Sequence, residues 1–128
     1  MDYYIAKTLQ LPFADVVAKV ISALKDEGFG ILTDTDVSAT LKSKIGVEWR
    51  PYRILGACNP QLAYRALQAE DKIGVMLPCN VVVQEIESGK VEVATVDPKA
   101  AMEGVGNPVL TELAATVRGK LSAVIERL

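Results

Sequence analysis

Two stretches of helical periodicity, one near each end of the chain, most constrain its fold. Apolar residues recur at steps of three and one over residues 13–24, and a second apolar stripe runs over residues 110–128. Pro12 and Pro108 suit the first position of a helix, and Gly28 suits the stop of the first one. Each stripe predicts a helix that buries one face against another part of the chain.

The residues between the two helices are typical of strands. Apolar and polar residues alternate there, and Ser88-Gly89 predicts a two-residue hairpin turn. Pro78 lies near the middle of the fourth segment and predicts a bulge, an edge or a strand break, because proline cannot donate a hydrogen bond to a sheet. The predicted strands span residues 3–9, 30–37, 52–57, 73–87 and 90–96.

The order of these elements predicts an α+β fold in one domain over residues 1–128. Two short helices are also expected, about 39–45 after a Ser38 cap and about 60–70. The two long helices can then cover one face of a mostly antiparallel five-stranded sheet. The other face must be solvated, bind something or pair with a second copy, and apolar residues in the later strands favour a homodimer.

Composition excludes several classes of function. Lys and Arg number 14 against 16 Asp and Glu, so no excess positive charge favours nucleic-acid binding. The absence of His excludes Ser-His-Asp and Cys-His catalysis. Two Cys without an imidazole predict no metal site, and no cofactor is expected. No apolar run approaches the roughly 18 residues of a membrane span, and no signal peptide is evident, so we expect a cytoplasmic protein without a membrane association.

Cys58 is the first candidate for chemistry. It ends a predicted strand, and Asn59 follows as a good cap for the next helix. A helix N-terminus favours the thiolate form of a nearby cysteine, and Arg53 on the preceding strand could add positive charge there. The alternative is that Cys58 is a small buried hydrophobic residue, since free cysteines are often buried.

Cys79 lies between Pro78 and Asn80, and twenty residues separate it from Cys58. Two thiols, each followed by Asn, could form a reversible disulfide, act as a sulfenate with its resolving partner, or share a soft metal. If the third and fourth strands are neighbours, the thiols could be close, but the register is open. The alternative is a pair of cysteines that only pack in the core.

Two weaker patterns have ordinary structural roles as alternatives. Asp34 and Asp36 fall on one face of a strand, where paired carboxylates can act in acid-base catalysis, but acids beside a turn are usually solvated. The segment 49–53 interleaves two Arg with two aromatic residues. It could line a pocket for an anion or pack over the sheet edge.

Two segments resemble the hallmarks of the bacterial and archaeal family called domain of unknown function 302. They are Tyr-Arg-Ile-Leu-Gly-Ala-Cys-Asn-Pro-Gln-Leu-Ala at 52–63 and Ile-Gly-Val-Met-Leu-Pro-Cys-Asn-Val-Val-Val at 73–83. Gly-Phe-Gly at 28–30 also fits the end of the family's first helix. The resemblance implies a TATA-binding-protein-like arrangement of strand, helix, four strands and helix, and a homodimer. It implies neither DNA binding nor an established activity.

Three hypotheses for function follow. The first is a small-ligand binding protein, with Arg53, Asn59, Pro78 and Asn80 beside the two thiols, and a small anionic ligand favoured by the helix N-terminus. The second is a thiol-dependent redox or sulfur-handling enzyme, with Cys58 as the nucleophile and Cys79 as the resolving partner. The third is a structural or assembly module in which both cysteines only pack.

Overall fold

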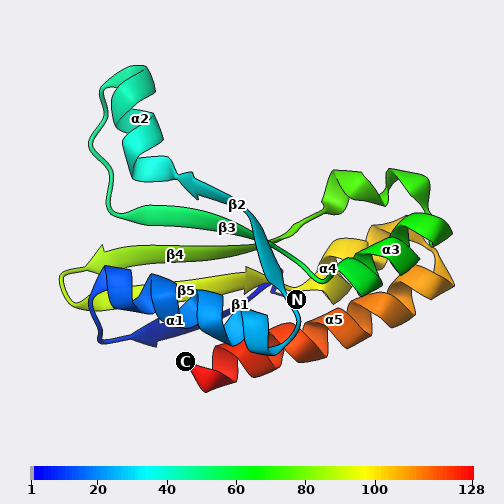
Figure 1. Cartoon of the computed structure of the whole chain (residues 1–128). Coiled ribbons are helices and arrows are strands. Elements are labelled where there is room, and N and C mark those ends of the chain that lie inside the picture. The colour runs from blue at the N-terminus through cyan, green and yellow to red at the C-terminus, as the bar shows by residue number, and fades with distance from the viewer. Residues whose placement is uncertain (1) are drawn as a thin grey trace.

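The strands form one antiparallel sheet in the order β1-β5-β4-β3-β2. The computed structural model describes residues 2–128, and Figure 1 shows the arrangement. This confirms the predicted α+β class with a five-stranded antiparallel sheet. The strands are β1 (Tyr4–Leu9), β2 (Gly30–Asp36), β3 (Tyr52–Cys58), β4 (Cys79–Glu87) and β5 (Lys90–Val96).

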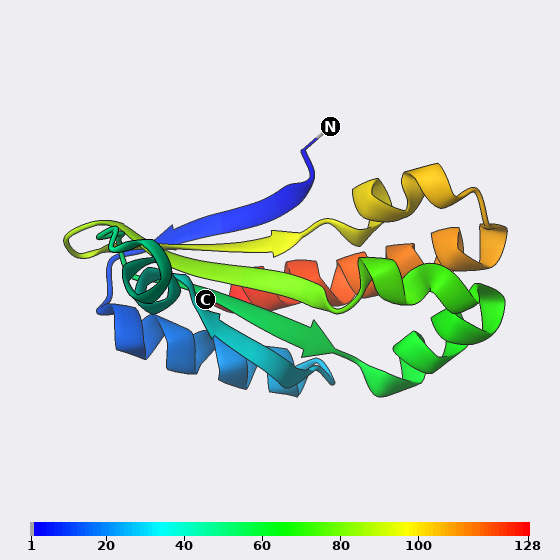
Figure 2. The ribbon, with the colours of Figure 1, turned by 90° about the horizontal axis from the view of Figure 1, so that it is seen from above.

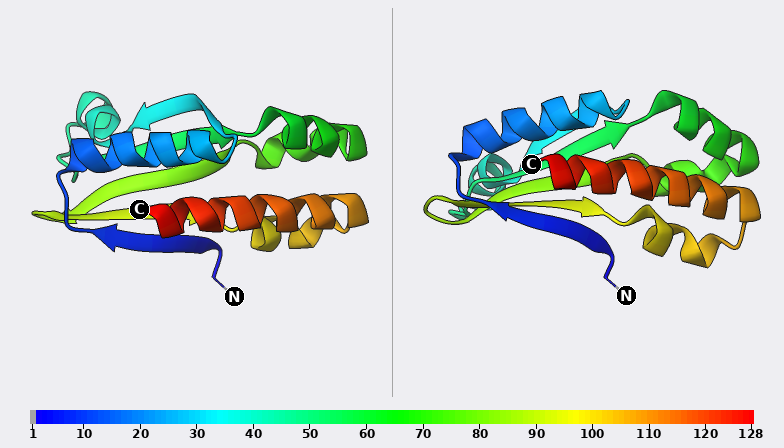
Figure 3. Two further views of the ribbon diagram at one scale, coloured as in Figure 1. Left: turned by 60° about the horizontal axis from the view of Figure 1, so that its bottom comes forward. Right: turned by 90° about the horizontal axis from the view of Figure 1, so that it is seen from below.

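Helices α1 (Phe13–Asp26) and α5 (Pro108–Arg127) lie side by side on one face of the sheet (Figure 3). Alternation along each strand turns one set of apolar side chains toward these helices. The main core therefore combines residues such as Leu55 and Val83 of the sheet with Val20 and Leu121 of the helices. The two helical stripes of the sequence are the faces that become buried.

The opposite face of the sheet is not covered by α1 or α5. Helix α2 (Val37–Ile45) rises from that side beside the ends of β2 and β3 (Figures 1 and 2). It has no buried residue, although Asp36 caps it by accepting a 2.9 Å hydrogen bond from the Ala39 backbone N–H. The predicted cap, Ser38, is therefore wrong. Asp36 caps the helix, because the strand passes directly into the helix.

Beyond one end of the sheet, several short helices pack on the N-terminal half of α5 (Figure 1). A second hydrophobic cluster holds them together through Ala66, Ile73, Leu110 and Leu113. The elements are α3 (Pro60–Ala69), η1 (Asp71–Met76), α4 (Pro98–Met102) and η2 (Glu103–Val105), of which η1 and η2 are 3-10 helices.

The prediction of a strand over residues 73–87 is wrong at its beginning. Residues 71–76 form η1, and β4 starts only at Cys79. Two local features explain the difference. The Glu70 side chain accepts a 3.1 Å hydrogen bond from the Lys72 backbone N–H, which starts a turn, and Pro78, preceded by a cis peptide bond, has no N–H for a ladder.

No helix within residues 2–128 has both the length and the apolar content that crossing a membrane requires.

Candidate functional site

A pocket of about 60 Å³ lies where β3 and β4 leave the sheet and meet α3, α4 and α5. Its wall is almost entirely apolar, and five elements contribute to it. Both cysteines line it, together with residues such as Leu62, Met102 and Leu113. The pocket therefore lies at the junction between the main core and the second cluster.

The strand register accounts for the proximity of the two cysteines. Cys79 pairs with Ala57 across β3 and β4, so Cys58 is one residue beyond the partner of Cys79. Neighbouring strands are about 4.8 Å apart and rise about 3.3 Å per residue, which puts the two Cα atoms roughly 6 Å apart. The register that the sequence left open thus brings both cysteines to the pocket at the ends of β3 and β4, and both are free.

Cys79 is suited to the protonated state. Burial, and to a smaller extent the negative charge that Cys58 would carry, together raise the pKa of its thiol to about 11. A desolvated thiolate without a positive partner is disfavoured, because low-dielectric surroundings penalise the charged form. At neutral pH Cys79 therefore presents a neutral S–H to the pocket.

Asn59 and Pro78 join the cysteines, and both are held in place by the fold. Asn59 caps α3, since its side chain accepts a 3.3 Å hydrogen bond from the Leu62 backbone N–H. Pro78 lies against Gly56, where an added Cβ would come within 2.8 Å of Pro78 Cγ and would also overlap the hydroxyl of Thr33. Only glycine leaves room for this approach.

Arg53 and Asn80, the other two predicted ligand-binding residues, do not line the pocket. Arg53 is near the far end of β3 and forms a two-pronged ion pair with Asp34, with 3.0 Å between Arg53 Nε and Asp34 Oδ1. Asn80 lies on the open face of the sheet, because it is one residue along β4 from Cys79 and strand side chains alternate.

The weaker patterns have structural roles. Asp34 pairs with Arg53 and Asp36 caps α2, so the two carboxylates are not a free acid-base pair. The Arg50 guanidinium lies 4.7 Å from the Trp49 ring centroid, a cation–π contact on the surface. Within residues 2–128 there is no group of three or more His, Cys, Asp or Glu that could hold a metal ion.

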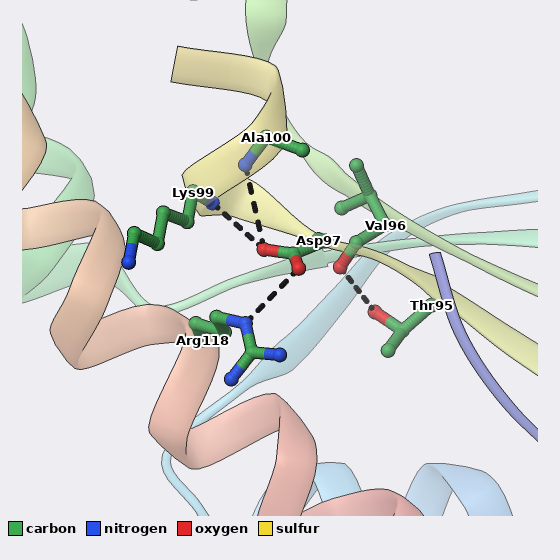
Figure 4. Close-up of polar contacts among 6 residues, drawn as sticks. All are labelled: Thr95, Val96, Asp97, Lys99, Ala100 and Arg118. Carbon is green, nitrogen blue, oxygen red and sulfur yellow. Dashed lines mark hydrogen bonds and ion pairs between the residues drawn. The ribbon is translucent and has the colours of Figure 1, made fainter. Parts of the chain in front are cut away.

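Helix α4, which was not predicted from the sequence, contributes Pro98 and Met102 to the pocket wall. Asp97 fixes this helix, as Figure 4 shows: it accepts hydrogen bonds from the Lys99 and Ala100 backbone N–H groups and a 3.0 Å bond from Arg118 Nε on α5. The Asp-Pro pair at 97–98, an N-cap followed by a first-turn proline, was the signal that could have found it.

The Asp97 carboxyl is held in its charged form. Burial alone would raise its pKa, but the hydrogen bond from Arg118 and those from the α4 backbone outweigh burial and hold the pKa below its usual value. The α4 wall of the pocket is therefore tied to α5 by a charged contact near neutral pH.

Comparisons with known proteins agree with this architecture. The model of the family described as "Domain of unknown function DUF302" matches residues 5–128. The crystal structure of an uncharacterized conserved protein DUF302 from Bacillus stearothermophilus has 29% sequence identity and a TM-score of 0.91, and the alignment covers 99% of this chain and 98% of that one. None of the curated proteins matches the chain significantly. Since the family match spans almost the whole sequence, this chain belongs to the domain of unknown function 302 family.

Proposed function

We propose that this protein binds a small molecule whose apolar end enters the pocket beside Cys58 and Cys79. The observation that carries the proposal is an apolar pocket built by five elements. Its volume of about 60 Å³ is below the roughly 150 Å³ of an engineered cavity that takes up benzene. The pocket therefore suits the end of a short chain, with the polar part of the ligand left at the mouth.

The polar part of the ligand would lie near the beginning of α3. The first backbone N–H groups of a helix favour negative charge, and Cys58 and Asn59 directly precede α3. A short carboxylic acid with an unbranched tail fits both properties of the pocket. n-Butanol and butyrate are suitable probes, because they share the tail and differ in the charge of the head.

Titration of each probe, followed by amide chemical shifts in NMR spectra, tests the proposal. We expect saturable shifts confined to residues around the pocket, and tighter binding of butyrate. Ala63→Leu fills the pocket from α3 and should abolish the shifts, whereas Ala115→Leu on the exposed side of α5 should leave them unchanged. Equal responses in both variants, or no saturable response, would refute ligand binding there.

A thiol-based function is the second candidate, and the observation that favours it is that both cysteines line one pocket. Cys58 would be the nucleophile and Cys79 the resolving thiol. The raised pKa of Cys79 weighs against it as an attacking thiolate, so ligand binding is the preferred function. Hydrogen peroxide should then oxidise Cys58 to a sulfenic acid with release of water, and Cys79 should condense with it to a disulfide with release of a second water. A disulfide in the unchanged chain, and a persistent sulfenic acid at Cys58 in Cys79→Ser that reacts with dimedone, would favour the thiol-based function.

A third outcome corresponds to a structural or assembly module. In that case both cysteines would resist labelling until the protein unfolds, and neither probe would bind. Cys→Ser changes would then lower stability, because a hydroxyl in an apolar site is costly without a hydrogen bond.

We propose further that the protein is a cytoplasmic homodimer with reduced thiols. The uncovered sheet face supports the dimer, because one central row of that face, from Ala6 to Ile54, is apolar. Sedimentation equilibrium over a range of concentrations tests the oligomeric state, and a monomer at every concentration would refute it.

A further inference from the structure

The arm, which we define as residues 37–49, exposes large apolar side chains. Ile45 is 67% exposed, Val47 42% and Trp49 46%. Arg50 lies over one part of the Trp49 ring, and helix α2 in the arm has no buried residue. A cluster of large apolar side chains at the end of a projecting element is typical of an interaction surface.

The arm is nevertheless a preformed element. Its helix begins at the Asp36 cap and ends at Gly46, whose φ of 69° is the left-handed conformation that glycine adopts easily. The return segment is tied to the helix by the Ser38 hydroxyl, which donates a 2.9 Å hydrogen bond to the Trp49 carbonyl, and by the Lys42–Glu48 ion pair. Binding through the arm would therefore require little ordering.

The sheet groove is a second uncovered surface, a hollow of about 490 Å³ on the open face. Val82 and Ala94 form its floor. They belong to an apolar row that crosses four strands, because Ala6 pairs with Ala94, Ala94 with Val82, and Val82 with Ile54. Tyr residues stand at its sides, and Glu92 is the one charged residue among those that line it within residues 2–128.

The two surfaces match each other in chemistry. Both present aliphatic side chains, and the arm carries a net positive charge from Lys42, Lys44 and Glu48, whereas the groove carries the Glu92 carboxylate. Both are also on the same side of the sheet, because α2 rises from the open face (Figure 2). The arm of the same chain leaves its own groove empty, since Ile45 and Trp49 remain exposed.

We infer that the sheet groove receives the arm of a second copy of this chain, and that the second copy's groove receives the first copy's arm. A two-fold axis between the open faces would make both contacts at once and close the assembly as a dimer. This inference rests on the proposed homodimer and adds the surfaces that form it. This dimer leaves the pocket beside Cys58 and Cys79 free, because that pocket lies among α3, α4 and α5 on the helical side.

Sedimentation equilibrium on the full chain and on three single variants tests the inference. Ile45→Glu puts a negative charge on the arm, and Ala94→Lys puts a positive charge on the groove floor. Val75→Glu is the matched control, because Val75 is 85% exposed on η1, away from both surfaces. Circular dichroism verifies that each variant is folded.

We expect the two interface variants to weaken dimerisation by about a hundredfold or more, because each dimer loses two contacts, and the control to dimerise like the unchanged chain. Trp49 is the only tryptophan, so its fluorescence emission should also shift to longer wavelength when the dimer is diluted. If the unchanged chain is a dimer and both interface variants dimerise equally tightly, the arm-in-groove contact is wrong and the homodimer stands. If the chain is monomeric up to about 1 mM, both are wrong.

Discussion

Alkylation of Cys79 in the folded protein should be slow and steeply dependent on pH. With a pKa of about 11 in place of 9.0, roughly one Cys79 thiol in a thousand is a thiolate at pH 8, compared with about one in ten in the unfolded chain. Because iodoacetamide reacts with the thiolate, the folded protein should react about a hundredfold more slowly at this site.

The assay is labelling of the reduced protein with iodoacetamide from pH 7 to 11, with the peptides of Cys58 and Cys79 measured separately by mass spectrometry. The same protein unfolded in guanidinium chloride is the reference. The rate at Cys79 should rise about tenfold per pH unit up to about 11. An inaccessible thiol of ordinary pKa would instead reach its plateau near pH 9.

A plateau near pH 9, or a folded rate within a few-fold of the unfolded rate at pH 8, would refute the argument that burial controls this thiol. Cys58→Ser offers a second check. It removes the charge that adds to the effect of burial, so the pKa of Cys79 should fall slightly while remaining raised.

The same shift has a consequence for stability. The thiol loses its proton more readily in the unfolded chain than in the folded one, so the unfolded state is favoured as pH rises from about 9 to about 11. The contribution of the protonated Cys79 thiol to the free energy of unfolding is fully present below pH 9. A difference of two pKa units corresponds to about 2–3 kcal/mol. Urea unfolding at pH 8 and at pH 10.5 measures this effect. Between these pH values the unchanged chain should lose more free energy of unfolding than Cys79→Ala, which has no thiol at this position.

Further predictions concern the framework of the pocket. Gly56→Ala should lower the free energy of unfolding by about 1–3 kcal/mol, because its Cβ would overlap Thr33 and Pro78. Gly119→Ala in α5 should raise it by up to about 1 kcal/mol, because no atom lies within 4 Å of the added Cβ. Urea unfolding measures both, and changes of the same sign would contradict the packing argument. Asp97→Ala should cost about 1–3 kcal/mol by removing the α4 cap and the Arg118 contact. Because the pKa of Asp97 is lowered, its contribution is present above the usual carboxyl pKa of about 4 and is lost as pH falls below it, so Asp97→Ala should cost less at pH 2 than at pH 7.

The fold was largely predictable because local signals agreed with the final packing. The two helical stripes, the capping residue Asn59 and the hairpin at 88–89 each specify an element without reference to distant residues. The family resemblance added the topology. The strand prediction was wrong at residues 73–76, where Ile73 is instead buried in the second cluster and Val75 is exposed on a 3-10 helix.

The candidate site was only partly predictable. Cys58, Asn59, Pro78 and Cys79 were predicted to lie together, and all four line the pocket, since each is beside a strand end. Arg53 and Asn80 were misplaced because their positions depend on which face and which end of a strand they occupy, and one residue changes the face. The wall from α4 depends on long-range packing that no short motif encodes.

The sheet order also has a consequence for how the chain folds. Strands β2 to β5 are neighbours in both sequence and space, whereas β1 pairs with β5 across about ninety residues, with Tyr4 opposite Val96. Closing such a long loop is slow, so the meander of β2 to β5 should acquire protected amides before β1 does. During synthesis β1 stays unpaired until β5 has been made, which is nearly three-quarters of the way along these 128 residues. Pulse-labelled hydrogen exchange during refolding would show whether the amides of β1 are the last to be protected.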